Sequence, residues 1–177
     1  MVIATQNPIE QEGTFLLPEA QKDRFLVRLG LGYPSWRDEK EMCERFQLGH
    51  PIDKLQPVTT PARIVACQQA VRAVSVNSEM CNCVLGLVRA TREPGGYAPE
   101  LATWIEVGAS PRGAIGLDRC ARAHAWLAGR DYVALDDVRA IAHDVLRHRL
   151  VMSYEANAGG VDPDRALDGL LQRVAAP

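Results

Sequence analysis

Three polar residues stand at the ends of predicted elements, where their side chains could act on a bound anion. Asn7 directly follows a β-branched run, and an amide at the carboxyl edge of a parallel sheet can hold a water or a phosphate oxygen. Arg24 ends a short helical run, and a fixed guanidinium there can reach a phosphate on another subunit. Arg112 lies in the first turn of a predicted helix, whose free N–H groups already favour an anion.

Each of these residues also has a simpler interpretation. Asn7 can merely start the turn that precedes Pro8, because Asn favours turns. Arg24 can form a local ion pair with Asp23 or Glu19, a contact of little energetic value if it is exposed. An arginine in a first helical turn opposes the helix dipole slightly, so both interpretations of Arg112 stay open.

The cysteines and histidines give no metal-ligand spacing. Five cysteines lie in apparently helical segments without a Cys-x-x-Cys pair, so we expect small buried hydrophobic residues in a reducing compartment. The histidines at 124, 143 and 148 are expected at the surface or at its boundary, and no metal site is predicted. The cysteines are Cys43, Cys67, Cys81, Cys83 and Cys120.

The first fifty residues alternate between predicted strands and helices. Residues 2–5 are β-branched and predict a short strand, and the alternation over residues 25–31 predicts a second one. The loop and brief helix between them favour a parallel pair. Ser35 then predicts the N-cap of a helix that ends near Leu48.

Every predicted element after residue 60 is a helix. The five apolar stripes share helical spacing, and short amphipathic helices with brief loops predict a small bundle. Residues 92–108 contain two prolines and a Gly-Gly pair, which predicts a long irregular break. The predicted N-caps of four of these helices are Thr60, Asn77, Ser110 and Asp162.

Length and charge limit the functional classes. The 177 residues suffice for one compact domain, or for a small domain and part of another. A net charge of −2 lacks the basic excess of a protein that binds nucleic acid mainly by charge. No stretch approaches the ~20 apolar residues of a membrane span, and the first residues lack the pattern of a signal peptide, so a cytoplasmic protein is expected.

Five sequence strings, taken in order, resemble motifs of the MoxR family of AAA+ ATPases, and the resemblance covers nearly the whole chain. Each string alone is weak to moderate evidence, whereas five in the family's order are specific. The strings are ATQNPIEQEGT (4–14), LPEAQ with DRF (17–25), GYPS (32–35), GASPR (108–112) and GRDYV (129–133).

The resemblance implies a role for each polar residue. Asn7 matches sensor 1, which positions the attacking water, and Arg24 matches the arginine finger, which acts on ATP held by the neighbouring protomer. Arg112 matches sensor 2, which reaches from the helical lid to the nucleotide of its own subunit. The family uses ATP and Mg²⁺, forms rings that are usually hexameric, and acts in a chaperone-like way in metal-cofactor insertion or complex maturation. Its partners often carry a von Willebrand factor A domain.

The sequence departs from the family at the phosphate-binding motifs. It contains no Gly-x-x-x-x-Gly-Lys-Ser/Thr and no hydrophobic strand that ends in paired acids. The only adjacent acidic pair with apolar neighbours before it is Asp136–Asp137, whose position indicates a helix cap. We therefore expect the carboxyl-terminal half of such an ATPase. By itself it is expected neither to bind ATP and Mg²⁺ tightly nor to hydrolyse ATP.

The expected fold is mainly α: the end of an α/β AAA+ core with two parallel strands, then an all-helical lid. The core part is predicted over residues 1–50, a linker over 51–59 and the lid over 60–177. The alternative function is a non-catalytic helical module that docks a partner protein. A helicase-like motor is a third possibility that conflicts with the charge.

Overall fold

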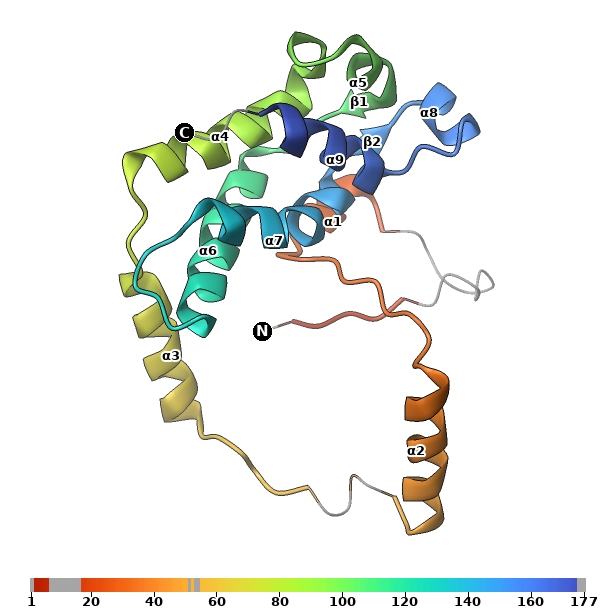
Figure 1. Cartoon of the computed structure of the whole chain (residues 1–177), viewed down its shortest axis with the longest axis vertical. Helices are drawn as coiled ribbons and strands as arrows, with labels where there is room; N and C mark the ends of the chain where they lie inside the picture. The colour runs from red at the N-terminus through yellow and green to blue at the C-terminus, as the bar shows by residue number, and fades with distance from the viewer. Residues whose placement is uncertain (1, 7–16, 51, 53–54, 175–177) are drawn as a thin grey trace.

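The computed structural model describes residues 2–6, 17–50, 52 and 55–174, and it is mostly helical (Figure 1). The α-helices are α1 (Glu19–Lys22), α2 (Trp36–Gln47), α3 (Pro61–Ala73), α4 (Ser78–Arg92), α5 (Pro99–Trp104), α6 (Pro111–Leu127), α7 (Leu135–Leu146), α8 (Tyr154–Ala158) and α9 (Pro163–Arg173). The described residues also form the 3₁₀ turns η2 (Pro94–Gly96) and η3 (Arg147–Arg149) and the short strands β1 (Ile105–Val107) and β2 (Val151–Met152).

The predicted N-caps are confirmed. Each of the five side chains accepts a hydrogen bond from a backbone N–H in the first turn of its helix, which satisfies a donor that has no partner inside the helix. The caps are Ser35 for α2, Thr60 for α3, Asn77 for α4, Ser110 for α6 and Asp162 for α9.

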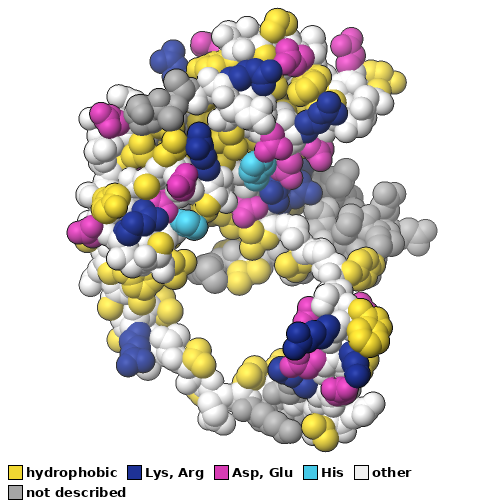
Figure 2. All heavy atoms as spheres, in the orientation of Figure 1, with side chains coloured by type: hydrophobic (Ala, Val, Ile, Leu, Met, Phe, Trp, Pro, Cys, Tyr) yellow, Lys and Arg dark blue, Asp and Glu magenta, His cyan; other side chains and the backbone are white. Residues whose placement is uncertain are grey.

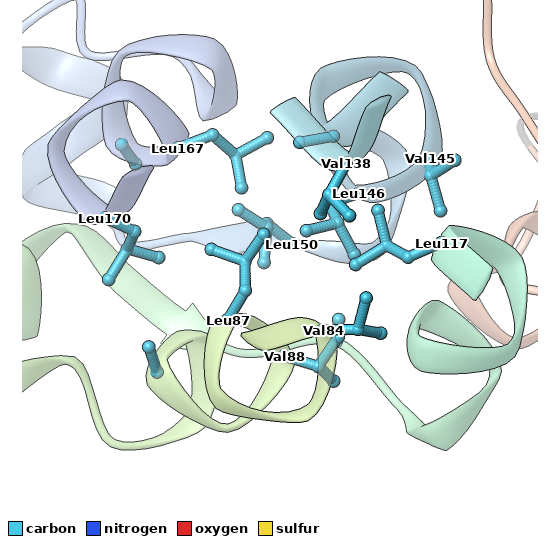
Figure 3. Packing of buried hydrophobic residues seen from close by; sticks show 14 of the residues in the cluster. Val84, Leu87, Val88, Leu117, Val138, Val145, Leu146, Leu150, Leu167 and Leu170 are labelled. Carbon is cyan, nitrogen blue, oxygen red and sulfur yellow. The ribbon is translucent and has the colours of Figure 1, made fainter. Parts of the chain in front are cut away.

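The core lies between α4, α6, α7 and α9. Figure 3 shows side chains from these four helices pointing toward one another, with Leu87 on α4 and Leu117 on α6 both fully buried. The stripe predicted for α7 is confirmed, because Val138, Val145 and Leu146 are buried in this cluster. The mainly α fold class is therefore confirmed.

The two predicted parallel strands are wrong. Residues 2–6 and 27–34 form no helix or strand in the structure. The backbone of Phe25, Leu26 and Arg28 instead bonds to side chains and backbone of the α7–η3 region. A strand requires a neighbouring strand to satisfy its backbone groups, and at residues 25–28 the α7–η3 region takes that place.

The predicted break at residues 92–108 is also wrong, and the bundle is not entirely helical. Pro94 and Pro99 occupy the first positions of η2 and α5, where proline starts a helix because its missing N–H is not needed. β1 pairs antiparallel with β2 through Ile105 and Met152. The apolar residues Leu101 and Ile105 are buried, which explains why this segment is ordered.

α2 lies apart from the core, whereas α3 contacts α6 at the edge of the bundle. Figure 1 shows the chain leaving α1, passing through α2 and returning through α3 to α4, and Figure 2 shows an open gap between α2 and α3. Neither helix has a buried residue. The division of the chain at residues 50 and 60 stays a prediction.

Candidate functional site

The structure brings the segment that carries Arg24 to the helix end that carries Arg112. Arg24 is exposed in the turn after α1, and Arg112 is exposed in the first turn of α6. Ser110 joins them, because its hydroxyl donates to the Asp23 carboxylate at 2.8 Å and accepts from the Arg112 N–H at 3.1 Å. Asn7, the third predicted site residue, lies outside the described residues.

The loop before Arg112 is fixed by the end of α4. Thr91 is fully buried, and its hydroxyl accepts a hydrogen bond from the Ala109 N–H at 2.9 Å. Arg92 donates from Nε to the Ala109 carbonyl at 2.7 Å. A Cβ atom at Gly108 would lie 2.3 Å from the Thr91 carbonyl oxygen, so only glycine permits this approach.

Close packing against α7 fixes the direction of α6. A Cβ atom at Gly113 would lie 3.1 Å from Leu146 Cδ2, and one at Gly116 would lie 2.9 Å from Val145 Cγ1. The missing side chains let the two helices approach each other closely. The position of Arg112 at the start of α6 is therefore set by the packed core.

The ion pairs expected for Arg24 do not form. Glu19 pairs with Lys22 at 2.6 Å, and the Asp23 carboxylate is bound by Ser110 and by Arg149. Across the described residues, no ion pair involves the side chain of Arg24 or that of Arg112. Exposed guanidinium groups of this kind suit phosphate oxygens, because the planar fork can bind two oxygens at once.

Arg149 in η3, the residue that binds the Asp23 carboxylate, was not identified from the sequence. Its side chain is only 2% exposed, and Nε donates to Asp23 Oδ1 at 3.2 Å. The available signal was its spacing, since Val138, Ala142, Val145 and Arg149 follow the buried stripe of α7. An arginine on a buried stripe indicates a buried partner.

His148 is buried, which corrects the expectation of a surface or boundary residue. Its Nε2 lies 3.0 Å from the Phe25 carbonyl oxygen and 2.9 Å from Arg149 Nη1. Its Nδ1 is buried without a hydrogen-bond partner among the described groups. Burial, opposed in part by the bond to Phe25, lowers the pKa of His148, and the positive charge of Arg149 lowers it further.

A second polar network surrounds Asp137, whose carboxylate is fully buried. Arg130 donates to it through two nitrogens, at 2.7 and 2.5 Å, and His124 Nδ1 lies 2.6 Å away. The Ala134 N–H donates to Asp137 Oδ2 at 2.8 Å, so the predicted capping role is confirmed. The bond to Arg130, despite the opposing effect of burial, holds the Asp137 pKa well below its usual range.

Other chemistry-bearing residues are dispersed. In the described ranges, no three side chains of His, Cys, Asp or Glu cluster in a way that could hold a metal ion. All five cysteines are free, and none is fully buried, which corrects the expectation of buried hydrophobic residues. No described helix has the length and apolar character that crossing a membrane requires.

Comparisons with known proteins cover the chain from end to end. The AAA lid domain family matches residues 101–170, and the family described as "ATPase family associated with various cellular activities (AAA)" matches residues 1–27. The chain is 39% identical to Chaperone MoxR1 of Mycobacterium tuberculosis over 178 aligned positions, which is all of this chain and 47% of that protein.

Two further comparisons agree with this match. Protein MoxR of Methylorubrum extorquens is 34% identical over 99% of the chain and 55% of its own length. A crystal structure of a Cytophaga hutchinsonii protein superimposes with a TM-score of 0.92 and 35% identity, over 97% of this chain and 52% of the other. The chain thus spans about half the length of the curated relatives it matches.

Proposed function

Homologues from the MoxR family of AAA+ ATPases cover this chain, and from that premise we propose that Arg24 and Arg112 act on ATP in a ring of subunits. Arg24 is the arginine finger for the neighbouring subunit's ATP, and Arg112 is the sensor 2 residue for the subunit's own ATP. The observation that carries the proposal is the pair of exposed guanidinium groups without ion pairs in the described structure, on either side of the Asp23–Ser110 contact.

The chemistry fits what these residues can supply. Phosphoryl transfer depends mainly on positioning and on stabilising charge that develops on phosphate oxygens, which two fixed cations provide. Asn7 is proposed to orient the attacking water. Mg²⁺, when bound, neutralises phosphate charge, and its ligands are proposed to lie outside these 177 residues, as does the phosphate-binding loop.

The biological role follows the family at the level of a proposal. The chain belongs to a chaperone-like ATPase that forms a ring, usually of six subunits, and acts with a von Willebrand factor A domain protein in maturation or metal-cofactor insertion. The 177 residues alone are proposed not to hydrolyse ATP, because they lack the lysine of a phosphate-binding loop.

Mixing two inactive variants tests both roles together. In the complete product of the gene that encodes this chain, Arg24→Ala removes a group given to the neighbour, and Arg112→Ala removes a group used in the same subunit. Each variant alone is expected to lose ATPase activity, by about 1,000-fold for Arg24→Ala. A random equal mixture is expected to recover about a quarter of the wild-type rate, from subunits that keep Arg112 next to neighbours that keep Arg24.

Two outcomes would contradict the proposal. The first is an active enzyme in which neither substitution lowers the rate, and the second is a mixture that stays as inactive as its components. Tight ATP binding or ATP turnover by the isolated 177 residues would contradict the separate expectation that the chain alone neither binds ATP tightly nor hydrolyses it. The matched control is Arg173→Ala on α9, whose side chain pairs with Glu100 at the surface.

The exposed surface of α2 favours one alternative function, a module that docks a partner protein without catalysis. Met42 and Phe46, one helical turn apart, are 48% and 52% exposed on this helix, and large apolar side chains exposed side by side often mark an interaction site. This alternative predicts that the chain binds a partner without nucleotide and does not enter ATPase rings. Pull-down with and without ATP distinguishes the two functions.

A further inference from the structure

The residues on both sides of Arg24 are held by a single side chain of the helical bundle. Arg149 Nη2 donates to the Asp23 carbonyl at 3.2 Å and to the Phe25 carbonyl at 2.6 Å. Its Nε donates to the Asp23 carboxylate, and its Nη1 donates to the Leu26 carbonyl at 3.3 Å. Arg149 therefore binds the backbone immediately before and after Arg24 while the Arg24 side chain stays exposed.

This arrangement requires the shape of arginine. A guanidinium presents five N–H donors in a rigid plane, so one group can bind a carboxylate and several carbonyls at fixed angles. A lysine would keep the charge, but its single ammonium cannot span the same set of acceptors. Burial lowers the pKa of Arg149, and the Asp23 carboxylate opposes that shift.

The same side chain is anchored in the part of the molecule that carries Arg112. η3 continues α7, which packs on α6 through Val145 and Leu146, and Arg149 Nη1 also donates to the Val145 carbonyl. The Ser110 hydroxyl provides a second link, from the N-cap of α6 to the Asp23 carboxylate. The side chains of Arg149 and Ser110 thus both tie residues 17–28, called the Arg24 segment below, to the helices that position Arg112.

We propose that Arg149 is a positioning residue that fixes Arg24 on the helical bundle, so that the finger offered to one neighbour follows the position of the subunit's own lid. The proposal rests on the proposed function of Arg24. It adds a physical route by which the state of one nucleotide site reaches the next site in a ring.

The ATPase test uses Arg149→Lys in the complete gene product. Because a displaced finger lowers the rate of the chemical step more than it lowers binding, kcat is expected to fall by about 10- to 100-fold with little change in ATP affinity. The control is Arg130→Lys, which alters another arginine bound to a buried aspartate but contacts none of residues 17–28. Arg130→Lys is expected to keep kcat at temperatures where both variants are folded.

Subunit mixing separates positioning from general damage. Arg149→Lys subunits should regain activity when mixed with Arg112→Ala subunits, because their own site is intact and only the finger is displaced. They should not regain it with Arg24→Ala subunits. Rescue with Arg24→Ala but not with Arg112→Ala would place the defect in the subunit's own site and overturn the proposal.

A measurement on the 177-residue chain keeps the proposal testable without ATPase activity. The Arg28 N–H donates to the Asp144 carbonyl at 2.8 Å, so its hydrogen exchange reports whether the segment is docked. Arg149→Lys and Asp23→Asn should each speed exchange at Arg28 at least tenfold while amides of α9 stay protected. Unchanged exchange at Arg28 in both variants would overturn the proposal.

The two proposals fail in different ways. If Arg24→Ala and Arg112→Ala leave an active enzyme unaffected, the proposed function fails. If those two variants are inactive while Arg149→Lys keeps full kcat, the proposed function stands and the positioning role of Arg149 is wrong.

Discussion

Two polar networks of this chain each combine an aspartate, an arginine and a histidine, but one joins residues close in sequence and the other joins distant segments. The network of Asp137 connects groups at most 13 residues apart, at the turn between α6 and α7. The network of Arg149 connects groups 126 residues apart, from η3 to the turn after α1. The first closes a turn inside the bundle, and the second attaches a segment to it.

The two networks also differ in which partner is buried, the aspartate or the arginine. Asp137 is fully buried while the Arg130 side chain is 28% exposed. Arg149 is 2% exposed while the Asp23 side chain is 22% exposed. The buried apolar core begins at Val74 and includes no described residue of the Arg24 segment. The segment can therefore detach without opening the core, whereas the turn at Asp137 belongs to the cooperative fold.

The largest effect on stability is expected from Asp137→Ala. The substitution removes the acceptor for Arg130 and for the Ala134 N–H and leaves polar groups beside a buried cavity, so the free energy of unfolding should fall by about 3 kcal/mol. Urea unfolding followed by circular dichroism measures this loss. The control is Asp136→Ala, an exposed neighbour in the same helical turn, with an expected loss of about 0.5 kcal/mol. Equal losses would show that the dipole, and not the buried network, carries the stability.

The next largest effect is expected from pH, which should change the docking of the Arg24 segment. The pKa of His148 is lowered in the folded protein because its ring is buried beside Arg149, with Arg28 adding to the shift and Asp23 opposing it. The docked state therefore binds fewer protons than the open state, and docking weakens as pH falls below about 6.5, the ordinary pKa of histidine. Hydrogen exchange at the Arg28 amide, corrected for its intrinsic pH dependence, should become faster from pH 7.5 to pH 5.5 as docking weakens. The loss of docking free energy should be smaller than the loss of unfolding free energy caused by Asp137→Ala.

The matched substitutions for this test are His148→Gln and His124→Gln. The first should flatten the pH dependence of docking, because it removes the buried group that titrates. The second should keep that dependence, because His124 contacts the Asp137 network and not the Arg24 segment. A pH dependence that survives His148→Gln would assign the titration to another group.

The sequence predicted local structure well where the signal was local. The caps at Asn77 and Ser110 and the stripe of α7 depend on residues within one or two turns, and the structure confirms them. The predicted strand at residues 25–31 failed because its backbone partners, Arg149 and Asp144, lie more than one hundred residues away. No local pattern encodes such a contact.

The candidate site was predicted only in part. Arg24 and Arg112 were identified from short motifs, but their mutual placement depends on a serine cap that serves two partners and on a buried arginine. Arg149 follows the buried spacing of α7, yet its partner could not be chosen from spacing alone. Composition likewise could not show that two of the free cysteines would be exposed and the other three only partly buried.

The smallest effect is expected from Glu19→Gln on α1. This substitution removes a carboxylate charge near Asp23 without removing a contact to the buried Arg149. Glu19 pairs with Lys22 at 2.6 Å, but the two side chains are 58% and 36% exposed, so the ion pair is screened by solvent. The free energy of unfolding should change by about 0.5 kcal/mol or less, and exchange at Arg28 should stay at its wild-type rate. Asp23→Asn is the matched substitution four residues further on, since it makes the same change from carboxylate to amide at a group bound by Arg149 and Ser110. If Glu19→Gln released the segment as strongly as Asp23→Asn, net charge on α1 would hold the segment in place, and the geometric role of Arg149 would be lost.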